Sequence, residues 1–301
     1  MASEQGAEKE IESGLVKSLV LRAMGVGAFA GLLAFVFARI FAEPVIQSAI
    51  DYGSARDEVM NGLAIAAGRA PEPDGPDIFS RFVQSDIGIA VGMILFGVAV
   101  GCFFGVAYCL AYGRTGRVRP RPLALLTAWA GFLTIYLVPF VKYPANPPSI
   151  GNPDTIQQRG GLYLVMVVAS VVVGVGAVWV GQRLGGRFGN WNAALVAGVG
   201  FVVVIGVVMA ILPALGQLTV NAATEGGALT ETPQVVRTGA GVLVFPGFDA
   251  DTLYRFRLYS VAAQLILWTV LGVGFAPLAD KLLSASQGGG STSDRDLAAA
   301  N

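Results

Sequence analysis

The sequence has 301 residues but no histidine, two cysteines and only 13% charged residues. Without imidazole, any metal ion must be met by carboxylate, amide, carbonyl, phenol or sulfur ligands, or by a partner protein. Cys102 and Cys109 lie two helical turns apart, about 10.5 Å along one helix, which excludes a disulfide between them. The sequence also lacks a Walker A motif, a zinc-ligand cluster, a serine hydrolase elbow and a CxxCH haem motif, so we predict no enzyme.

Long apolar stretches are abundant instead: 54% of the residues are hydrophobic and the mean hydropathy is +0.64. A bilayer core of about 30 Å is crossed by roughly 20 apolar helical residues. We therefore predict an all-α integral membrane protein with a six-span domain over 17–284, an N-terminal tail over 1–16 and a disordered C-terminal tail over 285–301. The predicted transmembrane helices lie near 19–42, 87–112, 121–141, 162–184, 192–215 and 255–279.

The distribution of arginine predicts the orientation of these helices. Arg114, Arg117, Arg119 and Arg121 lie together in the connection 113–122, and such clusters favour the cytoplasmic face. Six spans then place both termini in the cytoplasm. The extracytoplasmic connections are two long loops, 43–86 and 216–254, and a shorter one, 142–161. The formal net charge is zero, which gives no reason to expect a nucleic-acid partner.

Glycine recurs through the second predicted span, with three pairs spaced four residues apart. Small residues at this spacing let helix backbones approach closely, so we expect this helix to pack at the centre of the bundle. A narrow ion path lined by the missing side chains is the alternative. The glycines are Gly88, Gly92, Gly97, Gly101 and Gly105.

Charged residues at the outer ends of the spans suggest ion pairs. Arg39 and Glu43 are four residues apart, as are Asp251 and Arg255, so each pair can form on one helix face. Each pair is interpreted as an ion pair or as interface anchors whose charged ends reach toward water, and a transport role, with Glu43 in an ion path, is the alternative.

Three further polar residues have no such local partner. Asp86 and Arg257 begin the second and sixth spans, and we predict that they pair with each other across the outer ends; a substrate-facing role is the alternative. Gln264, deep in the sixth span, either makes a hydrogen bond that supports helix packing or forms part of an ion path.

A polar connection, VKYPANPPSIGNPDTIQQR at 141–159, interrupts the apolar sequence with four prolines, which stiffen it. Asn152 is suited to a helix N-cap, Pro153 to the first helical position and Asp154 to the first turn, so a helix is predicted to begin there.

This connection and its preceding span, FLTIYLVPFVKYPANPPSIGNPDTI at 132–156, resemble the CbtA family of predicted cobalt transporter subunits. FARIFAEPVIQSAIDY (37–52), RFVQSDIGIAVG (81–92) and LYRFRLYSVAAQLILW (253–268) also look like actinobacterial members of that family. The resemblance implies a component of cobalt uptake in the bacterial plasma membrane. It also implies a small single-span, histidine-bearing CbtB-like partner, with self-association as the alternative.

The resemblance gives no ligand residues to carry over, and it implies cobalt as the transported ion rather than a tightly bound cofactor. Fixed oxygens of Asn146, Asn152 and Asp154 then suggest an outer ion entrance, whereas a purely structural strap is an equally good interpretation of the same loop. A membrane interaction or assembly protein that transports nothing is the alternative function.

Overall fold

The computed structural model describes residues 2–71, 83–116, 118–224 and 231–299. Within these ranges, five helices are long and apolar enough to cross a membrane. They are Ser13–Ala66, Asp86–Ala111, Pro120–Lys142, Pro153–Asn221 and Ala250–Ala285. This architecture agrees with the predicted class of all-α membrane protein.

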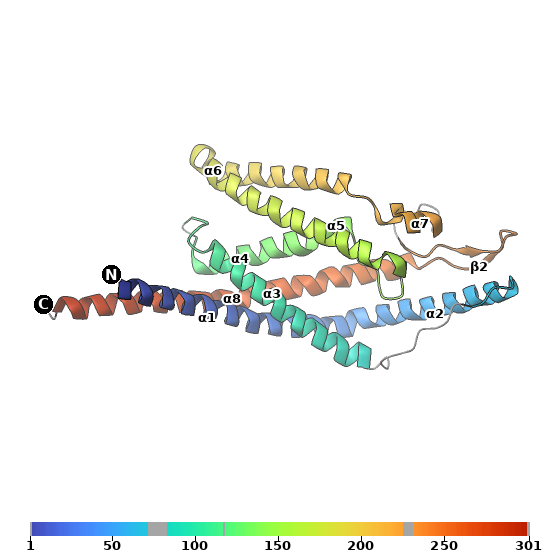
Figure 1. The fold of residues 1–301 in the computed structure, drawn as a ribbon, viewed down its shortest axis with the longest axis horizontal. Coiled ribbons are helices and arrows are strands. Elements are labelled where there is room, and N and C mark those ends of the chain that lie inside the picture. The colour runs from blue at the N-terminus through green and yellow to red at the C-terminus, as the bar shows by residue number, and fades with distance from the viewer. Residues whose placement is uncertain (1, 72–82, 117, 225–230, 300–301) are drawn as a thin grey trace. The chain divides into compact units, whose positions relative to one another are not determined.

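The elements follow the chain from α1 to α8 (Figure 1). The α-helices are α1 (Ala2–Phe37), α2 (Glu43–Ala66), α3 (Ile89–Ala111), α4 (Pro120–Gly131), α5 (Val138–Lys142), α6 (Ile156–Ile211), α7 (Thr219–Thr224) and α8 (Ala250–Ala299). The shorter elements are the π-helical turns η1 (Ala38–Ala42), η2 (Val83–Gly88) and η3 (Phe132–Leu137), the 3₁₀ turns η4 (Pro153–Thr155) and η5 (Leu215–Gln217), and the strands β1 (Val236–Arg237) and β2 (Leu243–Phe245).

The chain divides into two compact units. Unit 1 consists of residues 1–35, 89–133 and 264–301, and unit 2 consists of residues 36–88 and 134–263. Each unit therefore combines segments that are distant in the sequence.

In unit 1, glycines bring α1 and α3 into backbone contact. A Cβ atom added to Gly97 would lie 2.2 Å from the Gly27 carbonyl oxygen, and one added to Gly101 would lie 2.4 Å from the Ala23 oxygen. The predicted close packing is confirmed at Gly97, Gly101 and Gly105, but Gly92 faces open space. Only part of the glycine pattern is therefore used in helix contact.

Unit 1 is completed by aromatic packing and one ion pair. Phe275 of α8 packs edge-on against Phe104 and Tyr108 of α3, with ring centroids 5.2 and 5.1 Å apart. Arg121 Nε, at the start of α4, lies 2.8 Å from Asp280 Oδ2.

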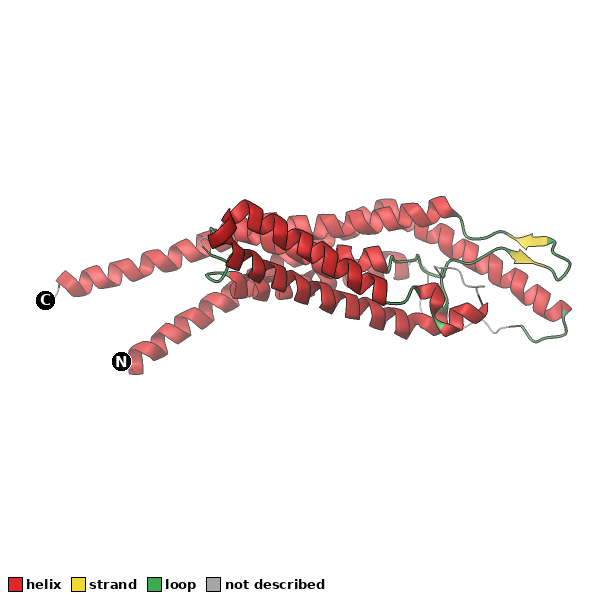
Figure 2. Ribbon diagram, turned by 90° about the horizontal axis from the view of Figure 1, so that it is seen from above, coloured by secondary structure: helices red, strands yellow, loops and turns green. Residues whose placement is uncertain are grey.

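Both chain termini lie at one end of this unit, which is also where α3 connects to α4 (Figures 1 and 2). Arg117 of that connection is outside the described residues.

In unit 2, α6 reverses its direction at Gly189, which has φ 75° and ψ 157°. Glycine adopts this backbone conformation without the steric cost that a side chain would add. The predicted spans 162–184 and 192–215 lie on the two arms, Ile156–Phe188 and Asn190–Ile211, and Figure 1 shows α6 folding back on itself. The predicted turn between these spans, near Arg183 and Arg187, therefore lies slightly later in the chain.

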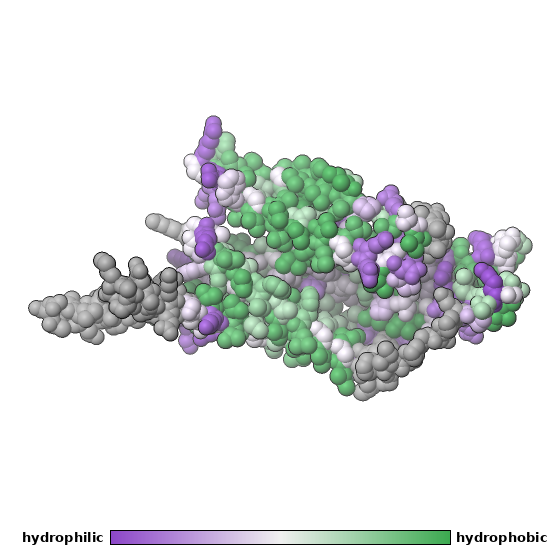
Figure 3. All heavy atoms as spheres, in the orientation of Figure 1, coloured by the Kyte–Doolittle hydropathy of each residue, from purple (hydrophilic) through white to green (hydrophobic). Residues whose placement is uncertain are grey.

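The arms of α6 present apolar side chains outward. Only 6% of the most apolar window in Pro153–Asn221 is buried, although its mean hydropathy is 3.0. Figure 3 shows this apolar surface over α6 in unit 2, with polar side chains near the turn. Such a surface is typical of a helix pair that faces lipid or another membrane helix.

One face of α6 packs inward on the core of unit 2. Met166 is fully buried and lies in a cluster with Val138, Tyr143 and Ile205, which joins α5 to both arms of α6. Ser170 adds a polar contact, because its hydroxyl donates to the carbonyl oxygen of Thr134 in the π-helical turn η3. The core therefore fixes the hairpin of α6 against α5.

The connections predicted as long loops contain regular structure. Residues 43–66 continue the first membrane helix as α2, directly after the π-helical turn η1, and Pro44 lies beside this irregular turn. Residues 216–254 contain α7 and the antiparallel pair β1–β2. Tyr52 of α2 packs on Phe245 and donates a 2.9 Å hydrogen bond to the Pro246 oxygen.

Helices extend into both predicted tails. α1 begins at Ala2, within the tail 1–16, and α8 continues to Ala299, within the tail 285–301. The physical reason is helix propagation: extending an existing helix adds one hydrogen bond per residue without the cost of nucleation.

Candidate functional site

The proline-rich connection is held at its N-terminal end by hydrogen bonds to backbone carbonyls. Lys142 Nζ donates to the Leu212 oxygen at 2.8 Å, and the Tyr143 hydroxyl donates to the Pro213 oxygen at 2.9 Å. Burial of the Tyr143 phenol raises its pKa. These bonds join the connection to the C-terminal end of α6.

The second half of the connection forms the predicted helix start. Asn152 Oδ1 accepts a 3.0 Å hydrogen bond from the Asp154 N–H, and Pro153 opens the turn η4 that leads into α6. The N-cap prediction is therefore confirmed. Asp154 remains exposed in the first turn, where its charge complements the helix dipole.

Behind this cap lies a buried carboxylate, Glu231, whose side chain is 0% exposed. Its Oε1 atom lies 2.5 Å from Thr155 Oγ1 and 2.5 Å from Asn221 Nδ2, both donors. Its Oε2 atom lies 2.9 Å from Arg159 Nη1. Asn152 Nδ2 donates to Asn221 Oδ1 at 3.0 Å and connects the helix cap to the same network. We call these five residues the Glu231 cluster.

Gly151 leaves the space that the Glu231 cluster occupies. Its φ of 127° is a conformation that side chains rarely adopt, and a Cβ atom there would lie 2.8 Å from Arg159 Nη1 and 3.4 Å from Glu231 Oε2. Any other residue would therefore press on the ion pair.

The predicted pair between Asp86 and Arg257 is replaced by another one. Arg39 Nε donates a 2.7 Å hydrogen bond to Asp86 Oδ1, so Asp86 pairs with Arg39. Arg257 instead donates to the Ala145 oxygen at 3.2 Å and to Asn146 Oδ1 at 2.9 Å.

Asp251 and Arg255 are both exposed, and the described residues include no ion pair between these two side chains, which fits the alternative of interface anchors. The nearby Asp249 caps α8: Oδ2 accepts from the Thr252 N–H and hydroxyl, each at 2.7 Å. These bonds, with the Thr252 hydroxyl contributing most, lower the pKa of Asp249. The capping pattern, an Asp three residues before Thr at the start of an apolar helix, was readable in the sequence.

The remaining predicted site residues lie in different surroundings. The side-chain oxygens of Asn146 and Asn152 already accept hydrogen bonds, whereas Asp154 is exposed. Glu43 is buried in unit 2, and Gln264 is half-buried in unit 1. Among the described residues, no group of three or more His, Cys, Asp or Glu side chains lies close enough together to hold a metal ion.

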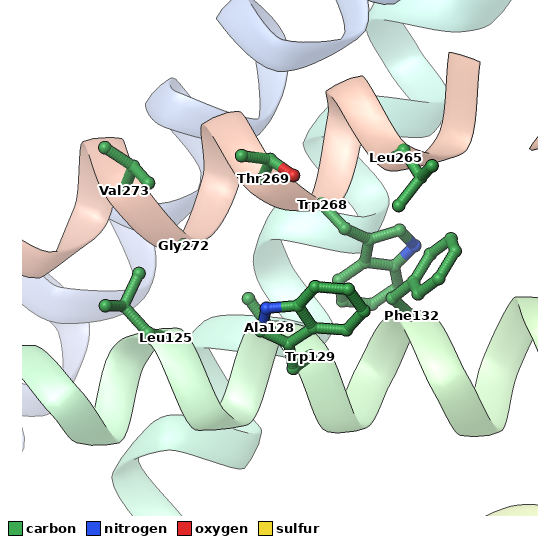
Figure 4. A pocket seen from close by; sticks show the side chains of 9 residues that line it. All are labelled: Leu125, Ala128, Trp129, Phe132, Leu265, Trp268, Thr269, Gly272 and Val273. Atoms are coloured by element: carbon green, nitrogen blue, oxygen red, sulfur yellow. The ribbon is translucent and has the colours of Figure 1, made fainter. Parts of the chain in front are cut away.

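A small cavity of about 70 Å³ in unit 1 has the wrong chemistry for an ion. It is lined on α4, η3 and α8 mainly by apolar and aromatic side chains, including Trp129, Phe132 and Trp268, with Thr269 supplying a hydroxyl (Figure 4). The Glu231 cluster in unit 2 is therefore the candidate for a polar functional site among the described residues.

Comparison with known protein families gives evidence about the function of the chain. The family described as "Probable cobalt transporter subunit (CbtA)" matches residues 16–280, a range that includes every predicted span and the whole Glu231 cluster. The chain belongs to the CbtA family. No curated protein and no solved structure matches it.

Membership of the CbtA family makes this chain a multi-pass membrane protein of a probable cobalt transport system. The family is a class of transporter subunits and not a class of enzymes, and the word subunit implies assembly with a partner. The family match therefore supports a general function for this chain as a membrane component of metal uptake.

Sequence reasoning missed most of the Glu231 cluster in this CbtA protein. An acidic residue in a connection between membrane helices is ordinary, so nothing in the sequence distinguishes Glu231 from exposed acids. Asn221 and Arg159 are likewise unremarkable without the fold. Only Asn152 could be found, because helix capping is a local pattern.

Arg257→Ala should loosen the proline-rich connection by removing two hydrogen bonds from one charged side chain. We expect a loss of about 2 kcal/mol in the opening free energy of this segment, measured by hydrogen exchange of residues 143–152. Arg255→Ala is the matched control, since Arg255 is exposed and two residues away. Equal exchange in both variants would show that Arg257 does not hold the connection.

Proposed function

We propose that this CbtA-family chain is the six-span component of divalent metal uptake in the bacterial plasma membrane, with Co²⁺ as the transported ion. The observation that carries the proposal is the family match over residues 16–280. Five long apolar helices, one of which reverses at Gly189, support six crossings.

Charge and geometry support an orientation with both termini in the cytoplasm. The α3–α4 connection carries Arg114 and Arg119, and it lies at the same end of unit 1 as the termini (Figures 1 and 2). Clustered arginines favour the cytoplasmic face. The proline-rich connection and the Glu231 cluster then belong to the outer side.

Partners follow from the same proposal. The apolar face of α6 suits the lipid bilayer or a further membrane helix, so a CbtB-like single-span subunit or a second copy of the chain can dock within the membrane. Because this chain has no histidine, its own ligands for Co²⁺ are oxygen and sulfur atoms, and weak oxygen ligation suits transient passage.

Cells that carry the gene should take up radioactive cobalt faster than cells that lack it, and Asp154→Asn should reduce that uptake at near-normal protein abundance. The reason is that Asn keeps the shape near the N-cap but removes the exposed charge at the proposed entrance. Uptake is measured alongside protein abundance in the membrane fraction.

The double variant Pro147→Ala/Pro148→Ala tests the structural alternative, since Pro147 is buried. If it lowers abundance and uptake together while Asp154→Asn changes neither, the connection is a strap. If the gene itself makes no difference to cobalt uptake, the transport function is wrong.

A further inference from the structure

The Arg159–Glu231 pair is unequal in its exposure. Glu231 is completely enclosed, whereas 27% of the Arg159 side chain is exposed. The long arginine side chain can therefore move its charge toward water, but the carboxylate cannot follow. A buried carboxylate that loses its partner is strongly destabilised unless another cation replaces it.

Arg159 is also the loosely held member of the Glu231 cluster. Its Nη2 atom makes only a long 3.5 Å contact with the Asn152 carbonyl oxygen. Its Nη1 atom is within ion-pair distance of Glu231 Oε2, yet that oxygen accepts no well-directed hydrogen bond among the described residues. Glu231 Oε1, in contrast, is held by Thr155 and Asn221.

The guanidinium therefore marks a position between two oxygens that suit a hard cation. One is the carboxylate oxygen Glu231 Oε2 and the other is the Asn152 carbonyl oxygen. Carboxylate and carbonyl oxygens, completed by water, are typical ligands of divalent cations that prefer oxygen. Gly151 leaves room for a cationic group at this position, because a Cβ atom there would lie 2.8 Å from Arg159 Nη1 and 3.4 Å from Glu231 Oε2.

We propose that Glu231 and the Asn152 carbonyl form a divalent-cation site that Arg159 occupies in the absence of metal, so that the ion enters by displacing the guanidinium. The metal replaces the positive charge that Arg159 removes, and the carboxylate stays neutralised throughout. This inference deepens the proposed transport function and rests on it for the identity of the ion as Co²⁺.

Arg159→Ala should increase the affinity of the purified full-length protein for Co²⁺ about tenfold, because the metal no longer competes with an internal cation. Co²⁺ should also raise the melting temperature of this variant more than that of the unsubstituted protein, since the apo variant has an unpaired buried carboxylate. The probe is Co²⁺ alone, measured by equilibrium binding and thermal unfolding in detergent.

Glu231→Gln should abolish this binding while the protein stays folded, because glutamine preserves the size of the side chain and Arg159 can turn to water. Asp251→Asn is the control for loss of an exposed carboxylate, and it should leave Co²⁺ affinity unchanged. Arg159→Lys, which keeps a charge but has no fork to contact both oxygens, should raise the affinity about threefold.

The proposal is overturned if Glu231→Gln binds Co²⁺ as the unsubstituted protein does, or if neither Arg159 variant binds it more tightly. Should Arg159→Ala fail to fold, Arg159→Lys and Glu231→Gln still decide between the outcomes. Cells that show no gene-dependent cobalt uptake, with binding changed as expected, would reject the transport function and keep the site. Gene-dependent cobalt uptake, together with Co²⁺ binding that is the same in all variants, would keep the transport function and reject the site.

Discussion

Gly97→Val should prevent most of the chain from accumulating as folded protein in the membrane. A Cβ atom at this position would lie 2.2 Å from the Gly27 carbonyl oxygen and 3.0 Å from the Gly31 Cα atom. Both are backbone atoms, which cannot turn aside as a side chain could, so α1 and α3 must separate. We expect a cost of about 3 kcal/mol, the upper end for overpacking.

Gly92→Val is the matched control, because it makes the same change on α3 where no atom lies within 4 Å. Membrane abundance, size-exclusion behaviour and melting temperature are compared for the two variants. Similar behaviour of both would mean that α1 and α3 do not cross through these glycines.

Met166→Ala should destabilise unit 2 by about 2 kcal/mol, by opening a cavity among Val138, Tyr143 and Ile205. This is the low end of the range for buried methionine in water-soluble proteins. In a membrane, lipid solvates an apolar side chain as well as protein does, so mainly the packing contacts are lost.

Leu164→Ala is the control for this substitution, since Leu164 is two residues away on α6 and 64% exposed. Its effect should fall within about 0.5 kcal/mol of zero. Stability is measured by unfolding in mixed micelles. A Leu164 variant as unstable as the Met166 variant would indicate that the exposed face of α6 is covered by protein.

The membrane segments and the helix start at Asn152 could be predicted from the sequence because their causes are local. An apolar stretch of about 20 residues needs no knowledge of its neighbours to be identified, and an N-cap depends on residues within one turn. The turn between the arms of α6 was placed only a few residues early for the same reason.

The partners of the charged residues could not be predicted, because they are set by contacts between distant segments. Arg39 bonds Asp86, 47 residues away, and nothing in the spacing of Arg39 to its neighbours predicts this contact. Arg257 was expected to meet a carboxylate and instead binds a carbonyl and an amide oxygen. Helical spacing shows which pairs can form, and only the packed fold selects among them.

The two arms of α6 differ in length, and this sets the depth of the Glu231 cluster in the bilayer. The arm Ile156–Phe188 has about 33 residues and is about 50 Å long at 1.5 Å per residue, well beyond the hydrocarbon thickness of about 30 Å. A tilt of about 20° shortens its projection by only a few ångströms. With the Gly189 turn and its neighbouring arginines at one membrane surface, the opposite end must project past the headgroups. In the proposed transporter, Arg159, in the first turn of this arm, would therefore lie at the level of water, where an ion would reach Glu231 before losing its hydration shell to the hydrocarbon.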